Sequence, residues 1–166
     1  MTPLSDKDLY SAITYARNLN ETEGQKILTD FHIEQPALAG TIFNIFSSII
    51  DENNKDMGAY FMDLCFDSLC VYSYSFGKAN PQTEEWIIAK MSEIETGMIA
   101  IKKNKTALPQ LEIVQRKFYD VLKDSIADYA NGHPARIPYI EMTQNIMLAS
   151  LNLLESLYEK EQGTIH

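Results

Sequence analysis

The sequence has few of the residues from which catalytic and metal sites are usually built. Its 166 residues include only three histidines, two cysteines and seven glycines. No histidine lies in a Glu-x-x-His or His-x-x-x-His pattern, which argues against a ferritin-like di-metal site and against a zinc protease. A glycine-rich phosphate loop and a Gly-x-Ser-x-Gly nucleophile elbow are also missing. We therefore expect no cofactor, and the sequence favours a protein that is not an enzyme.

Basic residues are scarce as well. The chain has 14 lysines and arginines against 23 aspartates and glutamates, a net charge of -9. A field of this sign repels phosphate backbones and anionic membrane surfaces, so neither nucleic acid nor membrane is an expected partner. The one basic cluster, at residues 102–105, is best interpreted as cations that offset a helix dipole at its C-terminus. A site there for phosphate or an acidic partner is the alternative.

Long hydrophobic runs are absent. The longest candidate, residues 64–76, is interrupted by Asp67 and three serines and is too short to span a membrane. Residues 1–7 do not resemble a signal peptide, so we expect a cytoplasmic protein. Cys65 and Cys70 point in different directions on one predicted helix and cannot pair within it. They are interpreted as buried, reduced thiols, with a redox role as the alternative.

What the sequence does contain is helical periodicity, divided by prolines at the expected helix starts and by glycines at the ends. It predicts one all-α domain over residues 1–166, a compact bundle of six or seven helices with flexible ends near residues 1–4 and 162–166. Strand signals are weak throughout. The expected helices cover residues 5–19, 22–31, 36–51, 55–76, 81–103, 109–131 and 138–160.

Two of these helices open in a similar way, with Gln35-Pro36-Ala37-Leu38 and with Leu108-Pro109-Gln110-Leu111. Each is followed by a second helix, so the pattern is compatible with two pseudo-symmetric helix pairs. We expect them in one closed bundle, because two copies are too few for a solenoid. Aligning Pro36 with Pro109 places these apolar residues on one another: Leu38 on Leu111, Ile45 on Phe118, Phe46 on Tyr119, and Ile49 on Leu122.

The opening Glu34-Gln35-Pro36-Ala37-Leu38, the long aromatic-rich helix after it and the second proline–leucine opening resemble an uncharacterised bacterial all-helical family. The resemblance extends over approximately residues 29–159. It implies an all-α fold, and it implies no activity and no functional residue.

The helix at residues 55–76 is apolar on all sides. A helix of this kind is usually buried in the centre of a bundle, and otherwise one of its faces is a subunit interface. Our leading hypothesis is a non-catalytic protein that acts through contacts of its helix faces, as a homodimer or with a protein partner. The residues expected at such an interface are Tyr60, Phe66, Tyr72, Tyr74 and Phe76.

Asp63 and Asp67 lie one turn apart on this apolar helix. Two carboxylates at this spacing could share a divalent ion or a proton, with His32 as a further ligand, so an enzyme or metal-binding protein is the alternative hypothesis. Exposure to solvent, or hydrogen bonds from tyrosine hydroxyls, would explain the pair without a function. A third hypothesis is a pocket for an apolar small ligand between the helices at 55–76 and 138–160.

Three aspartates recur at one-turn intervals farther along the chain, at Asp120, Asp124 and Asp128. Adjacent carboxylates at this spacing repel each other weakly on a helix. We interpret the stripe as a solvated helix face, with an acidic docking surface for a basic partner as the alternative.

Overall fold

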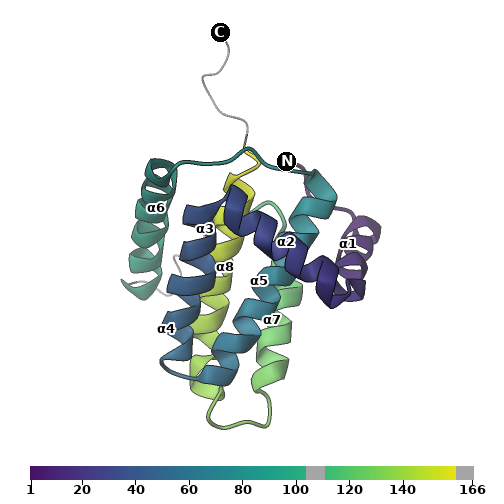
Figure 1. Cartoon of the computed structure of the whole chain (residues 1–166). Helices are drawn as coiled ribbons and strands as arrows, with labels where there is room; N and C mark the ends of the chain where they lie inside the picture. The colour runs from purple at the N-terminus through teal and green to yellow at the C-terminus, as the bar shows by residue number, and fades with distance from the viewer. Residues whose placement is uncertain (104–110, 160–166) are drawn as a thin grey trace.

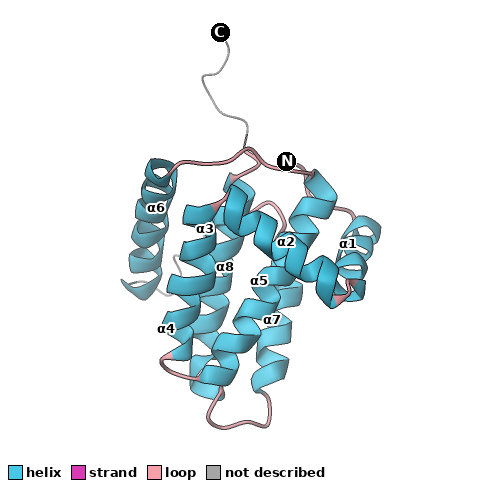
Figure 2. Cartoon of the chain, viewed as in Figure 1, coloured by secondary structure: helices cyan, strands magenta, loops and turns pink. Residues whose placement is uncertain are grey.

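A computed structural model of the chain describes residues 1–103 and 111–159, and the regular structure in these residues is entirely helical (Figures 1 and 2). This confirms the predicted all-α fold. The helices are α1 (Asp6–Asn18), α2 (Glu21–Glu34), α3 (Pro36–Ala39), the π-helix η1 (Gly40–Phe46), α4 (Ser47–Asp51), α5 (Lys55–Phe76), α6 (Glu84–Lys103), α7 (Arg116–Ala130), the short 3₁₀-helix η3 (Ile137–Tyr139) and α8 (Ile140–Ser156).

Polar side chains cap α1 and α5 at their N-termini. Ser5 accepts a hydrogen bond from the backbone N–H of Asp8, and Asn54 accepts one from Met57, at 3.1 and 3.0 Å. Such caps satisfy N–H groups that have no partner inside the helix. Gly77 ends α5 with a φ of +79°, a conformation that favours glycine. These local signals explain why the structure and the sequence agree on the bounds of α5.

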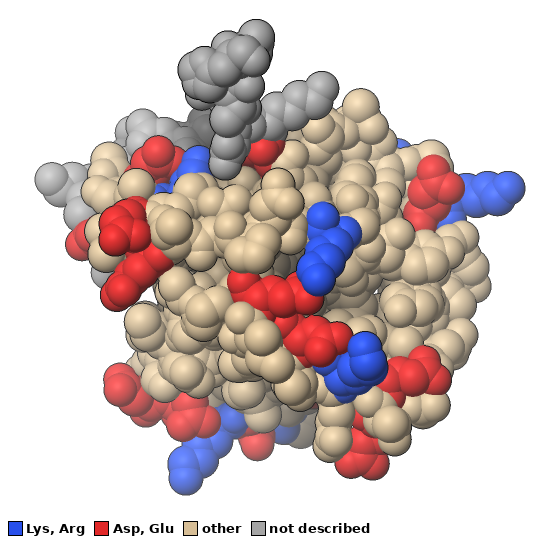
Figure 3. Space-filling model, turned by 45° about the horizontal axis from the view of Figure 1, so that its top comes forward, with Lys and Arg blue, Asp and Glu red and all other residues tan. Residues whose placement is uncertain are grey.

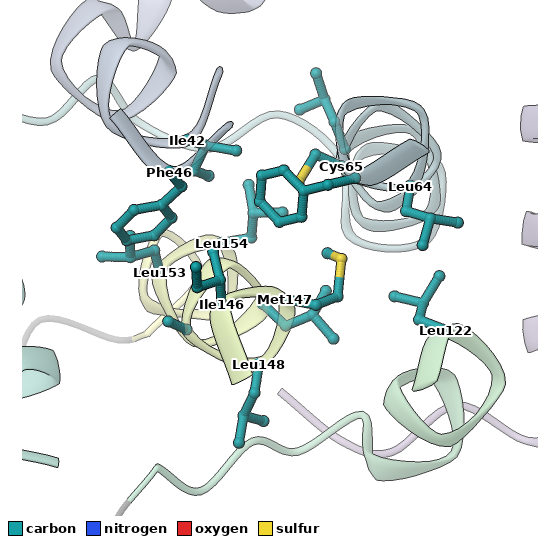
Figure 4. Packing of buried hydrophobic residues seen from close by; sticks show 14 of the residues in the cluster. Ile42, Phe46, Leu64, Cys65, Leu122, Ile146, Met147, Leu148, Leu153 and Leu154 are labelled. Carbon is teal, nitrogen blue, oxygen red and sulfur yellow. The ribbon is translucent and has the colours of Figure 1, made fainter. Parts of the chain in front are cut away.

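The core is formed by two helix hairpins, α3–η1–α4 with α5 and α7 with α8, and α5 and α8 pack against each other between them. Side chains from each helical segment of the two hairpins converge in Figure 4. Examples are Ile42 of η1, Leu64 of α5, Leu122 of α7 and Met147 of α8. The prediction that the helix at 55–76 is central is confirmed, because α1 and α4 also pack on α5.

Both cysteines are buried and unpaired in this core. Burial raises the pKa of the Cys65 thiol and brings the pKa of Cys70 to about 12, with the nearby Asp67 carboxylate adding to the second effect. The thiols therefore remain protonated at neutral pH, as the interpretation of buried, reduced cysteines requires.

The predicted start of a helix at Pro109 is wrong. Residues 111–115 are not helical, and α7 begins at Arg116, while residues 104–110 lie outside the described part of the chain. The buried Glu155 carboxylate accepts hydrogen bonds from the backbone N–H groups of Val114 and Gln115, which holds this segment out of the helix. The alignment of Pro36 with Pro109 therefore fails, because it pairs a helical Leu38 with a non-helical Leu111.

A repeat exists in a different register, defined by two glutamines that are each 4% exposed. Gln35 is the N-cap residue of α3; its amide donates to the carbonyl of Asn80 and accepts from the N–H of Gln82, at 2.9 and 3.1 Å. Gln115 is the N-cap residue of α7, and its amide bonds in the same way to Thr2 and Leu4, at 2.8 and 2.9 Å. Each glutamine therefore holds the short segment that leads into a helix of the other half of the chain.

The N-terminal segment is one of the two held in this way. Thr2 and Leu4 were expected in a flexible end, but Gln115 hydrogen-bonds to both. Residues 162–166 of the other expected flexible end lie outside the described residues, as do the side chains of the lysine cluster at 102–105.

Aligning Gln35 with Gln115 superimposes the buried positions of α3–η1–α4 on those of α7. The segments before α1 and α6 correspond in a second register, two residues shorter, which is fixed by the residues that the two glutamines hold, Thr2 and Leu4 in one half and Asn80 and Gln82 in the other. In this register Pro3 matches Pro81, and the capping residues Ser5 and Thr83 match each other. In Figure 1, α1 and α6 lie at opposite edges of the bundle, as two equivalent helices would. The matching buried pairs are Leu38 and Phe118, Ala39 and Tyr119, Ile42 and Leu122, Phe46 and Ile126, Ile50 and Ala130, and Leu9 and Ile87.

Candidate docking groove beside helix α6

The predicted carboxylate pair lies at the surface of α5. Asp63 is exposed and Asp67 is half-buried. Burial raises the pKa of Asp67, an effect that Arg17 opposes and Asp63 reinforces. His32 is exposed on α2, where its Nδ1 lies 2.8 Å from the carbonyl of Leu28. Among the described residues no three His, Cys, Asp or Glu side chains are grouped so as to hold a metal ion, so the structure does not bring His32 to the two aspartates.

The raised pKa of Asp67 leads to a prediction about stability. A carboxyl whose pKa is higher in the folded state than in the unfolded state stabilises the fold when protonated, and this contribution is lost as pH rises through the folded pKa. Asp67→Asn should therefore be more stable than the parent at pH 7, and the difference should vanish in acid. Urea denaturation at both pH values measures this, with Asp124→Asn, an exposed aspartate on α7, as the control. An Asp67→Asn variant less stable than the parent at pH 7 would contradict the prediction.

The five rings expected at a subunit interface do not form one surface. Tyr72 is 1% exposed, and its hydroxyl donates a hydrogen bond to Glu155 at 2.8 Å, so its place in the predicted interface is wrong and it belongs to the core. Tyr60 is half-buried and stacks on Tyr129, with the ring centroids 4.0 Å apart.

The other three rings also have partners within the chain. Phe66 and Phe76 are half-buried: the first lies against Gly24 of α2, and the second is 5.8 Å from the ring of Tyr158. Tyr74 is the exposed member of the set, at 53%, and it stacks on Tyr15. The surplus of aromatic residues on α5 is therefore covered mainly by the chain's own helices.

Exposed apolar side chains gather instead between the α3–η1 segment and α6. Ile45 of η1 is 54% exposed, and Ile88 of α6 is 62% exposed. They border an open groove of about 930 Å³ between the two elements. The floor is hollow at Gly40, since a Cβ atom placed there would meet nothing within 4 Å. The apolar and small residues along the groove are Pro36, Ala37, Gly40, Ile45, Ile87, Ile88 and Met91.

Two features of the fold position this groove. Gln35 holds the segment Asn80–Gln82 beside the start of α3, so α6 begins next to that helix. The π-helical turns of η1 bury Thr41, Ile42 and Phe43 in succession and leave Asn44 and Ile45 at the surface. Short π-helical turns are frequent at functional sites.

The equivalent face on the other half of the molecule has a different chemistry. The exposed charged residues of α7 stand where the first half has uncharged ones, and Lys117 forms an ion pair of 2.7 Å with Asp6 of α1. The predicted solvated stripe on α7 is confirmed, since its three aspartates are exposed. The corresponding pairs are Lys117 and Ala37, Asp120 and Gly40, Asp124 and Asn44, and Asp128 and Ser48.

The groove is mostly apolar, its uncharged polar lining residues are Thr41, Asn44, Gln82 and Ser92, and its charged lining residues are all acidic. Glu84 and Glu95 border it, and no lysine or arginine does so among the described residues. Carboxylates are also spread over the face of the molecule in Figure 3, with basic side chains between some of them. A ligand for this groove must therefore match an apolar centre and an acidic rim.

The sequence contains a signal for this groove in its distribution of charge, which helical periodicity alone does not reveal. No charged residue occurs from Gln35 to Ile50, although a surface helix normally carries charges on its outer face. The matching helix α7 has charged residues throughout. An uncharged outer face on a peripheral helix could have indicated Ile45 and its neighbours as contact residues.

A smaller pocket, of about 360 Å³, lies where α2, α5 and α8 meet. Its lining includes Glu34 and Lys78, which form an ion pair of 2.7 Å. Asp30, Gln35 and Ser73 also line it, and its large apolar and aromatic lining residues are Ile27, Phe31, Leu69, Tyr72, Leu154, Leu157 and Tyr158.

No protein-family model, curated protein or solved structure matches the chain. The resemblance to a bacterial helical family therefore stays a prediction. Among the described residues, no helix is long and apolar enough to cross a bilayer.

Proposed function

We propose that this chain is a non-catalytic cytoplasmic protein that acts through a protein–protein contact at the α3–α6 groove. The observation that supports the proposal is the difference between the two halves. Where α7 presents Lys117 and Asp120 to solvent, α3 and η1 present Ala37 and Gly40 beside exposed Ile45. An exposed apolar surface of this kind on a water-soluble fold is typical of an interaction site.

The contact takes one of two forms, a homodimer or a complex with a different protein. A homodimer would bury this groove against the same groove of a second copy, because a twofold interface pairs one surface with itself. A different protein would present its own apolar side chains to the same groove. The two unpaired, buried cysteines suit the reducing cytoplasm in either case.

The double variant Ile45→Glu/Ile88→Glu tests the proposal. Both side chains are largely exposed, so the variant should fold with an unchanged melting temperature and lose the contact. Light scattering after size exclusion measures self-association, and a photo-cross-linker at position 88 in cells reports other partners. Ile33→Glu on α2 is the matched control, since Ile33 is 72% exposed and lies outside the groove. A chain that stays monomeric and cross-links to no protein from position 88 would refute the proposal.

The pocket between α2, α5 and α8 supports a second candidate function, binding of a small apolar ligand. A volume of about 360 Å³ with mostly apolar lining is within the size range of small-molecule sites, roughly 300–1,000 Å³. Native mass spectrometry of freshly purified protein should show an added mass that is lost after denaturation. Leu69→Trp, which would fill the pocket, should remove that mass.

A further inference from the structure

We propose that the groove receives an amphipathic helix from another protein, with an apolar face and with lysine or arginine along its edges. The inference rests on the proposed function, that the α3–α6 groove is a protein-binding surface, and it specifies the chemistry of the partner.

The shape of the groove suits a helix. It runs between two helical elements, with Ile45 on one wall and Ile88 and Met91 on the other. Ala37 and Gly40 line it from the α3–η1 side, and no atom covers the Cβ position of Gly40 within 4 Å. Amphipathic helices commonly place apolar residues, spaced three and four positions apart, into grooves of this kind.

The charges identify the sign of the partner. Asp6 at the start of α1 pairs with Lys117 of α7 at 2.7 Å. Glu84 holds the position of Asp6 at the start of α6, but Ala37 holds the position of Lys117, so this cation is missing from the groove. In the register that matches α1 with α6, Glu95 replaces Arg17. The groove therefore has the carboxylates Glu84 and Glu95 but no counterpart of Lys117 or Arg17. A basic partner would supply the missing positive charges.

A second copy of this chain suits the groove less well. It would bring its own Glu84 and Glu95 against the same carboxylates, and each copy has a net charge of -9. Like charges brought together at an interface discriminate against that partner. A basic helix meets the same rim with opposite charges.

Two synthetic peptides of about 18 residues, or roughly five helical turns, test the inference. They share one apolar face and carry either lysine and arginine or glutamate and aspartate along its edges. Fluorescence anisotropy with the full chain measures their affinities at low and at high salt. We expect the basic peptide to bind at least about tenfold more tightly, with an affinity that falls as salt screens the charges.

Variants of the chain locate the binding site. Gly40→Leu fills the floor at a position with ordinary helical backbone and open space above it, so it should fold normally and abolish binding. Glu84→Lys combined with Glu95→Lys should weaken the basic peptide and strengthen the acidic one. Ile33→Glu, away from the groove, should leave both affinities unchanged.

The outcomes separate this inference from the proposed function. Equal affinity for the two peptides, or a charge reversal at Glu84 and Glu95 without effect, overturns the basic partner and leaves the groove as a contact site. A homodimer that Ile88→Glu dissociates also overturns it and supports the proposed function. If neither peptide binds and no contact at position 88 is found, both fail.

Discussion

Replacing Glu155 with leucine should lower the free energy of unfolding by about 3–4 kcal/mol, because each buried donor left without an acceptor costs roughly 1–3 kcal/mol. The Glu155 carboxylate accepts hydrogen bonds from the Tyr72 hydroxyl and from the backbone N–H groups of Val114 and Gln115. The variant leaves all three donors without their acceptor. Urea denaturation followed by far-UV circular dichroism measures the loss.

The effect should be specific to the buried network. Glu159 is four residues after Glu155 and its side chain is exposed. Glu159→Leu should therefore change the free energy of unfolding by less than about 0.5 kcal/mol, as surface substitutions usually do. Tyr72→Phe should cost about 1 kcal/mol, since it removes one hydrogen bond. If Glu155→Leu is as stable as the parent, the carboxylate does not hold the segment before α7.

Gly58→Ala should lower the free energy of unfolding by about 2–3 kcal/mol, within the range for overpacking a tightly packed interior. A Cβ atom at position 58 would lie 2.9 Å from both the Cα and the Cβ of Asp51. The contact involves the backbone where α4 turns into α5, which cannot move without separating the two helices. Thermal and urea unfolding should both show the loss.

Gly40→Ala is the matched comparison within a helical segment. Its Cβ meets nothing within 4 Å, so the substitution should be neutral or should stabilise the chain by up to about 1 kcal/mol, the usual difference in helix propensity. Equal stabilities for the two alanine variants would contradict the close approach of α4 and α5. A stable Gly40→Ala variant would also show that the groove floor accepts a side chain.

Elements whose signals are local were predicted well. Asn54 caps α5 through an N–H three residues away, and Gly77 ends it, so both bounds can be found within one stretch of sequence. The continuous helical stretch from Pro36 to Asp51 was predicted for the same reason, although its π-helical part was not. The start of α7 was missed because it depends on the distant Glu155. The start of α6 was placed at Pro81 although the local cap is Thr83, so α6 begins at Glu84.

The candidate site shows the same division. Tyr72 looked like a surface ring because its helix is apolar on all sides, and only packing against α8 showed that it is buried. Ile45 and Ile88 are ordinary members of helical stripes in the sequence. Their exposure depends on where Gln35 holds the start of α6.

The sequence by itself determined the helical class, the acidic charge, the core position of α5 and both bounds of that helix. These properties follow from composition and from contacts between residues three or four positions apart. The tertiary structure alone decided the register of the repeat, the burial of Tyr72 and the groove beside α6. The reason is physical: each depends on a hydrogen bond between distant residues, such as Gln115 with Leu4 and Gln35 with Gln82, which neither periodicity nor propensity encodes.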